Sequence, residues 1–125
     1  MIYLSLLKKY LKKYETTIFL VNTGWIGGAY GVGSRIPIYE TRHIITAILS
    51  GELDNVTCRH DEIFNLFVPV AVSGVDPKIL NPSLFWPDKN LYLKSVKNLA
   101  GLFVENIKKF PGVDQSIINS GPKNI

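Results

Sequence analysis

The spacing of apolar and polar residues along the chain predicts a mixture of helices and strands. Over residues 2–14, apolar side chains recur three and four positions apart with lysines between them, which predicts an amphipathic helix. Residues 16–21, TTIFLV, form a β-branched and apolar run without alternation, a pattern typical of a buried strand covered on both faces. Because a strand follows at once, we expect the helix to pack on a core rather than to lie on a membrane surface.

The next elements follow from the same patterns. Apolar residues at helical spacing predict a helix over residues 40–50, with Gly51 as its C-terminal cap. Residues 56–60 and 64–72 have the composition of strands. Glycine and proline residues predict turns over residues 73–87.

A proline followed by an acid at residues 87–88 predicts the start of a last long helix, which runs to about Phe110. Its inward face is expected to carry Tyr92, Val96, Leu99, Phe103, Ile107 and Phe110. Residues 111–125 are expected to form a short helical turn and a loose end. Earlier in the chain, RIPI at residues 35–38 predicts a short strand, with Pro37 at an edge or a bend.

Composition limits the classes of function. Apolar residues make up 46% and charged residues 19% of the 125, which indicates a globular chain of mixed α and β structure, one domain or part of one. The net charge of +4 is too small to indicate a nucleic-acid partner. The single Cys58 excludes a disulfide framework and fits a reducing compartment. With no targeting signal and no membrane-spanning run, we expect a cytoplasmic protein that binds neither nucleic acid nor membrane.

Five glycines lie between the first predicted strand and the helix at 40–50, at positions 24, 27, 28, 31 and 33. Glycine adopts positive φ at little cost and lets the backbone approach a ligand, so such loops often hold phosphates or nucleotides. The letters miss the specific fingerprints, because GVGSRI lacks the lysine of a Walker A loop and the third glycine of the dinucleotide-binding pattern. On spacing alone, a nucleotide loop and a long surface turn are about equally favoured.

Other polar residues give weaker signals. Arg35 and Arg42 flank the predicted short strand, and a guanidinium can grip a phosphate or stack on a purine, although most such arginines are solvated. Cys58 and His60 share one face of their predicted strand, and His43 is a further candidate ligand, but two close ligands do not make a tetrahedral site. We therefore predict no metal centre and no catalytic residue in this chain.

Residues 20–42, LVNTGWIGGAYGVGSRIPIYETR, resemble a segment of the ATP-dependent phosphoenolpyruvate carboxykinases. In that family a strand and a glycine-rich loop lead to the arginine that meets the nucleotide. The similarity continues in order through AILSGELDN, IFNLFVPVAVSGVDPKILNPSLFWPDK, LAGLFVENIKKF and INSGPK. It covers nearly the whole chain, so it is far more specific than any single motif.

The resemblance implies the C-terminal part of that enzyme's nucleotide-binding domain, a single partial domain over residues 1–125 with an incomplete sheet and flanking helices. Arg35 and Ile36 match the family's arginine–apolar pair at the nucleotide, and Thr41 matches its threonine beside the purine and ribose. The side-chain chemistry agrees, since these residues offer a planar cation, a dry wall and a hydroxyl. Ser34 stands where many members carry lysine, which weakens the phosphate contact.

The family converts oxaloacetate and ATP to phosphoenolpyruvate, ADP and carbon dioxide in gluconeogenesis, with Mg²⁺ and Mn²⁺. Its phosphate-binding loop, metal ligands and oxaloacetate-binding arginines match nothing in this chain. We therefore expect a C-terminal fragment that is inactive alone, binds ATP or ADP at most weakly, and takes the upstream portion of the enzyme as its partner in trans. Two alternatives stay open: a stand-alone nucleotide-binding module and an interaction remnant without catalysis. The fragment is expected to expose apolar surface and an unpaired strand edge at residues 17–21.

Overall fold

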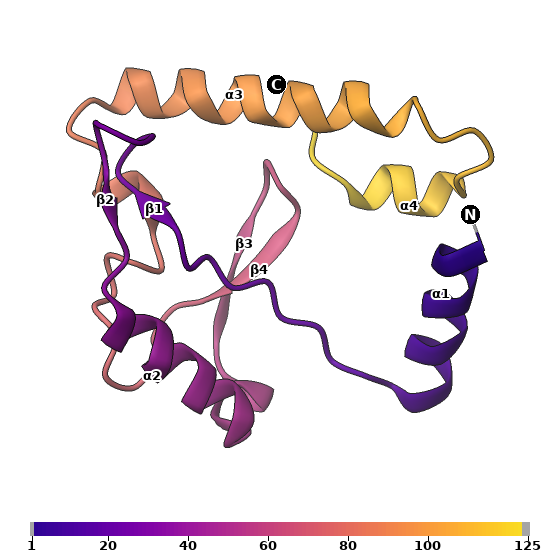
Figure 1. Cartoon of the computed structure of the whole chain (residues 1–125), viewed down its shortest axis with the longest axis horizontal. Helices are drawn as coiled ribbons and strands as arrows, with labels where there is room; N and C mark the ends of the chain where they lie inside the picture. The colour runs from indigo at the N-terminus through magenta and orange to yellow at the C-terminus, as the bar shows by residue number, and fades with distance from the viewer. Residues whose placement is uncertain (1, 124–125) are drawn as a thin grey trace.

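A computed structural model describes residues 2–123 and shows helices and two small sheets in an open arrangement (Figure 1). The α-helices are α1 (Ile2–Tyr14), α2 (Ile38–Leu49), α3 (Lys89–Ile107) and α4 (Gln115–Ser120). The 3-10 helices are η1 (Glu52–Asn55) and η2 (Pro82–Leu84). The strands are β1 (Trp25–Ile26), β2 (Ser34–Arg35), β3 (Cys58–Asp61) and β4 (Leu66–Pro69).

Both sheets are antiparallel pairs. β1 pairs with β2 so that Trp25 lies opposite Arg35, and β3 pairs with β4 so that Cys58 lies opposite Pro69. The predicted strands at 56–60 and 64–72 are therefore present as the shorter β3 and β4. The mixed α and β class and the incomplete sheet with flanking helices are confirmed.

The small core lies beside α2. Its buried members are Ala47, Leu53, Val72 and Val75, and partly buried residues packed against them are Phe19, Ile44, Ile48, Val56, Ile79 and Leu80. Gly51, at φ 76°, ends α2 as predicted, because a left-handed residue lets the chain turn away from the last helical turn.

α2 begins two residues before its predicted start, and this corrects the predicted RIPI strand. β2 is Ser34–Arg35, and Pro37 is the residue that precedes the first turn of α2. Its φ of −57° already suits a helix, and the N–H that it lacks would have no partner in the first turn.

The predicted buried strand at residues 16–21 is wrong for this chain. The segment belongs to no helix or strand, and within residues 2–123 no backbone hydrogen bond involves residues 17–23. Ile18 is 60% and Leu20 is 79% exposed. A strand requires a hydrogen-bonded neighbour, and the strands of the described chain pair only with each other.

α1 has its predicted bounds, but the prediction that its apolar face packs on a core is wrong. Tyr3, Leu7 and Tyr14 are exposed. An ion pair from Lys8 Nζ to Asp114 Oδ2, 3.7 Å long, joins α1 to the residue that precedes α4. Figure 1 shows the two helices near one another. A pair with both side chains this exposed stabilises little, so it does not replace a packed interface.

α3 begins at Lys89, next to the predicted start. Asp88 caps it, and its Oδ1 accepts hydrogen bonds from the N–H groups of Asn90 (2.7 Å) and Leu91 (3.2 Å). The helix ends at Ile107 rather than Phe110.

The predicted inward face of α3 is only partly buried. Val96 is buried, and Tyr92 and Ile107 are half-buried. Leu99 and Phe103 are exposed, as is Phe110 beyond the helix end, so half of the predicted stripe is not buried by residues 2–123. Beyond it, the predicted short helical turn is α4, and the end of the predicted loose tail, residues 124–125, lies outside the described residues.

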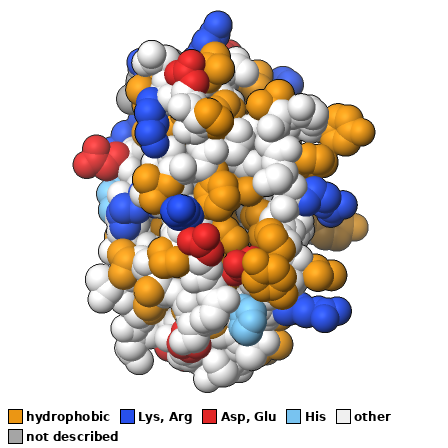
Figure 2. Space-filling view, turned by 90° about the vertical axis from the view of Figure 1, so that its left-hand side faces the viewer, with side chains coloured by type: hydrophobic (Ala, Val, Ile, Leu, Met, Phe, Trp, Pro, Cys, Tyr) orange, Lys and Arg blue, Asp and Glu red, His pale blue; other side chains and the backbone are white. Residues whose placement is uncertain are grey.

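The chain exposes more surface than a folded monomer of its mass. Its accessible area is 9519 Å², whereas the scaling for folded monomers gives about 6,700 Å² at 14.0 kDa. Figure 2 shows apolar side chains in the middle of the face that it views, between charged groups. Across residues 2–123, no helix is both long enough and apolar enough to cross a bilayer.

Candidate functional site

The glycine-rich stretch forms a tight loop between β1 and β2. Gly27, Gly28 and Gly31 have φ of 78°, 151° and 85°, conformations that side chains with a Cβ rarely adopt. The carbonyl of Ala29 accepts from the N–H groups of Val32 (3.0 Å) and Gly33 (2.9 Å), which closes the loop. These residues are glycine because the loop reverses direction within seven residues, 27–33.

Position 33 requires glycine for a different reason, because its φ is not positive and the space around it is the limit. A Cβ at this position would lie 2.5 Å from the carbonyl oxygens of both Gly28 and Ile26. Backbone atoms press directly on Gly33, so the loop keeps its shape only without a side chain there. Gly33 directly precedes β2 and therefore sets where Arg35 leaves the loop.

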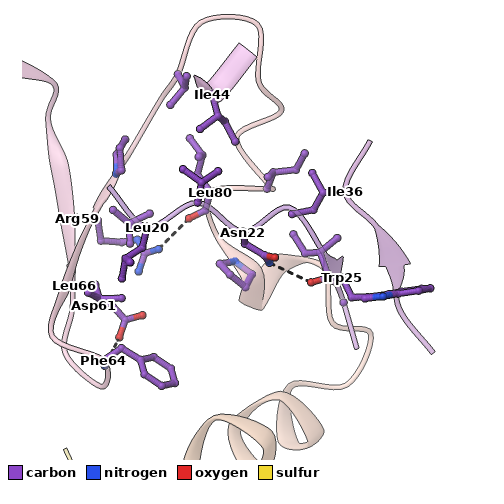
Figure 3. A pocket seen from close by; sticks show the side chains of 18 of the residues that line it. Leu20, Asn22, Trp25, Ile36, Ile44, Arg59, Asp61, Phe64, Leu66 and Leu80 are labelled. Atoms are coloured by element: carbon purple, nitrogen blue, oxygen red, sulfur yellow. Dashed lines mark hydrogen bonds between the residues drawn. The ribbon is translucent and has the colours of Figure 1, made fainter. Parts of the chain in front are cut away.

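Asn22 braces the entry to the loop, a role that the sequence analysis missed. Its Oδ1 accepts the N–H of Gly24 at 2.9 Å, and its Nδ2 donates to the carbonyl of Trp25 at 3.2 Å (Figure 3). Asparagine side chains commonly stabilise turns by a hydrogen bond to the backbone two residues onward. The sequence Asn22-Thr23-Gly24 could therefore have indicated this role. Across the loop, the N–H of Ile36 donates to the Gly24 carbonyl at 2.9 Å.

The three predicted nucleotide contacts lie on consecutive elements. Arg35 is in β2 and exposed, Ile36 follows it and is 6% exposed, and Thr41 is half-buried in the first turn of α2. Ile36 is one of the residues that line a large apolar hollow between the helices and the two strand pairs. Arg35 and Thr41 are not among the residues that line it. The nucleotide site at these residues therefore stays a prediction.

Glu40, which the sequence analysis did not single out, is buried beside these residues. It is 4% exposed, and its Oε2 accepts the N–H of Asp76 at 3.2 Å. Gly74 presses on the same helix, because a Cβ there would lie 2.7 Å from Nδ1 of His43. An acid in a first helical turn is usually solvated near the helix dipole, so sequence alone gives no sign of this contact. The turn at residues 74–76 is thus held against α2, next to Thr41.

A hollow of about 690 Å³ occupies the space between the elements. It is lined mainly by apolar side chains from the segment before β1, from the β1–β2 pair, α2, the β3–β4 pair and α3. Figure 3 shows side chains of the β3–β4 pair, including Leu66, on one side and those of Ile36 and Trp25 on the other, with Leu20 and Asn22 between them.

The few polar groups in the hollow are engaged with its own walls. Arg59 Nη2 donates to the carbonyl of Leu80 at 3.2 Å, and Asp61 Oδ1 accepts from the N–H groups of Ile63 (3.0 Å) and Phe64 (2.9 Å). Burial, with a smaller contribution from Asp61, raises the pKa of Tyr92, and Arg59 partly opposes this. The Arg59 contact holds the β3–β4 hairpin to the segment before η2, and the Asp61 contacts close the hairpin's own turn. The remaining lining of the hollow is mainly apolar.

Cys58 and His60 share one face of β3, as predicted. His60 Nε2 lies 2.8 Å from Oδ1 of Asn65, and its ring packs on Phe67 with centroids 5.0 Å apart. His43 lies instead against Gly74, so it does not join them. The part of the chain that the structure describes brings no three His, Cys, Asp or Glu residues together in a metal-binding arrangement.

Comparison with known proteins identifies the family. A family profile described as phosphoenolpyruvate carboxykinase matches residues 1–78. "Phosphoenolpyruvate carboxykinase (ATP)" of Caldanaerobacter subterraneus is 48% identical over 123 residues, which are 98% of this chain and 24% of that protein. The proteins of the same name from Fusobacterium nucleatum and Thermus thermophilus are 46% and 42% identical over 98% of this chain and 23% of their own length.

A small mixed α and β chain with a closed glycine loop between a strand pair and a helix defines only a broad class. The matches are specific: this chain belongs to the ATP-dependent phosphoenolpyruvate carboxykinase family. It spans about a quarter of the length of the curated relatives it matches.

Proposed function

We propose that this chain is the C-terminal part of an ATP-dependent phosphoenolpyruvate carboxykinase and supplies the purine and ribose side of its ATP site. Family membership over 98% of the chain is the observation that carries the proposal. The closed glycine loop supports it, because Gly33 fixes the position from which Arg35 leaves the loop. In this assignment the Arg35 guanidinium contacts the nucleotide, Ile36 packs against the purine base, and the Thr41 hydroxyl forms a hydrogen bond with a polar edge of the purine or ribose.

The chain alone is proposed not to catalyse the reaction. Phosphoryl transfer relies on cations and a backbone cradle around the phosphates, and no Gly-Lys-Ser/Thr run occurs in the sequence. Cys58, His60 and His43 do not fit a metal centre, since His43 lies apart against Gly74. The Mg²⁺ and Mn²⁺ of the family reaction are therefore assigned to the remainder of the family polypeptide. The single cysteine supports a cytoplasmic location.

A chimera tests the assignment. This chain replaces the matching quarter of the Caldanaerobacter relative, and phosphoenolpyruvate formation from oxaloacetate and ATP is measured. We expect activity, and we expect Arg35→Ala to raise KM for ATP by about 10- to 150-fold, the loss of a hydrogen bond to a charged group. Arg42→Ala, an exposed arginine on α2 for which the resemblance gives no role, is the matched control.

Three results would overturn the proposal or part of it. A folded chimera without activity contradicts the assignment to this enzyme. Equal effects of Arg35→Ala and Arg42→Ala contradict the role of Arg35. Turnover by the isolated chain contradicts its proposed inactivity.

The alternative of a stand-alone nucleotide-binding module is tested on the isolated chain. Titration calorimetry with ADP at millimolar concentration gives binding heat if the loop holds a nucleotide without the rest of the enzyme. The absence of heat removes this alternative.

A further inference from the structure

The segment of residues 16–22 combines the sequence of a buried strand with the surroundings of an unpaired one. Its apolar residues include Ile18 and Leu20, 60% and 79% exposed, and Phe19, half-buried against the core beside α2. Within the described chain, none of the backbone groups of residues 17–22 makes a hydrogen bond with the backbone. In Figure 1 the segment runs from α1 toward β1 as an extended connection. Free backbone groups on an apolar extended segment are a template for strand pairing.

This segment forms part of the wall of the large hollow. Phe19, Leu20, Val21 and Asn22 all line it, together with residues of β1, α2, the β3–β4 pair and α3. An apolar hollow of about 690 Å³ that stays open is unusual in a folded domain, since interiors pack as densely as organic crystals. The excess accessible area of this chain is about 2,800 Å² above the scaling for a folded monomer. Counted over two partners this is about 5,600 Å², at the upper end of what obligate interfaces bury.

We propose that residues 16–22 and the hollow receive a β-strand and its apolar side chains from the remainder of the family polypeptide. That the remainder lies upstream of this chain is part of the proposed function, and the inference rests on it. The chain covers 24% of its Caldanaerobacter relative, so about three quarters of that protein is available to fill the site. The added strand pairs with the free N–H and C=O groups of residues 17–22, and its neighbours cover Ile18 and Leu20.

A second copy of this chain is a less suitable occupant. It can offer its own residues 16–22 to one edge of the segment, but it brings the same open hollow with it. A segment with apolar residues on both faces requires covering layers on both sides, as in a buried sheet. The remainder of the family polypeptide is long enough to supply a sheet and its layers.

Amide hydrogen exchange tests the inference in the isolated chain and in the chimera. We expect the amides of residues 17–22 to exchange without protection in the isolated chain, and roughly 100-fold or more slowly in the chimera. Leu20→Asp in the chimera is expected to abolish that protection. Leu49→Asp is the matched control, because Leu49 is 82% exposed, as Leu20 nearly is, but does not line the hollow.

Each contrary result has one meaning. Unprotected amides in a folded chimera, or equal effects of the two leucine substitutions, overturn the inference. Protection in the isolated chain overturns it too, and its loss on dilution would identify a second copy as the occupant. An inactive chimera with residues 17–22 protected contradicts the proposed function and leaves the inference standing. A chimera that does not fold contradicts both.

Discussion

Replacing Gly33 with alanine is expected to weaken nucleotide binding by deforming the loop that leads to Arg35. The added Cβ would lie 2.5 Å from the carbonyl oxygens of Gly28 and Ile26, and 2.7 Å from the Gly28 nitrogen. All three are backbone atoms, which cannot rotate aside as a side chain can. The two sides of the loop must separate by about 1 Å to restore van der Waals contact, and Arg35 moves with β2.

The expected size of the effect follows from this overpacking. Inserting a methyl group into a closely packed site destabilises by about 1–3 kcal/mol. If the loop must return to its original shape to bind, the ADP affinity of the chimera falls by about 5- to 150-fold. Titration calorimetry of the Gly33→Ala chimera with ADP, against the unsubstituted chimera, measures this directly.

Gly101→Ala is the matched control. A Cβ at Gly101, in the interior of α3, meets nothing within 4 Å. Alanine is the better helix former, so α3 should gain about 0.5–1 kcal/mol, and ADP affinity should not change. If Gly33→Ala binds ADP as tightly as the unsubstituted chimera, the close approach of the loop's backbone does not shape the nucleotide site, and the reasoning fails.

Three further predictions concern single contacts. Asp88→Ala is expected to destabilise the start of α3 by about 0.5–2 kcal/mol, seen as faster exchange of the Leu91 amide; unchanged exchange would show that the cap is dispensable. Glu40→Ala leaves the Asp76 N–H without its partner and is expected to lower the free energy of unfolding by about 1–3 kcal/mol, whereas Glu40→Gln, which keeps an acceptor oxygen, should cost less; equal losses in denaturant titrations would contradict the hydrogen bond. Hydrogen bonds from Ser116, first from its N–H and then from its hydroxyl, lower the pKa of Asp114 below 3.8. The stability that the Asp114 carboxylate contributes to α4 is therefore present above pH 3.8 and is lost as the pH falls through the lower, folded-state pKa. NMR titration of the Asp114 carboxyl in the chain and in Ser116→Ala checks this, and equal pKa values in the two would refute it.

Elements with local signals could be predicted from the sequence. Gly51 marks the end of α2 because its left-handed conformation is a property of one residue, and Asp88 marks the start of α3 because its side chain caps amides two and three residues away. The family resemblance likewise depended on letters alone, and the comparisons confirmed it.

Features that depend on distant partners were mispredicted or missed. The composition of residues 16–21 indicates a buried strand, but burial needs neighbours that the described chain does not supply. The predicted inward face of α3 is partly exposed for the same reason, because the residues described do not supply enough packing neighbours. Glu40 was missed because its partner, Asp76, is 36 residues away, and no periodicity links the two. The nucleotide contacts at Arg35, Ile36 and Thr41 still depend on the resemblance.

The positions of the two tryptophans give the chain a built-in optical reporter. Trp25 and Trp86 are the only tryptophans in the sequence, and both line the same hollow. Indole emission shifts to shorter wavelength when water leaves its surroundings. The tryptophan fluorescence of this polypeptide is therefore expected to shift when that space fills, and no dye or label is required to follow the change.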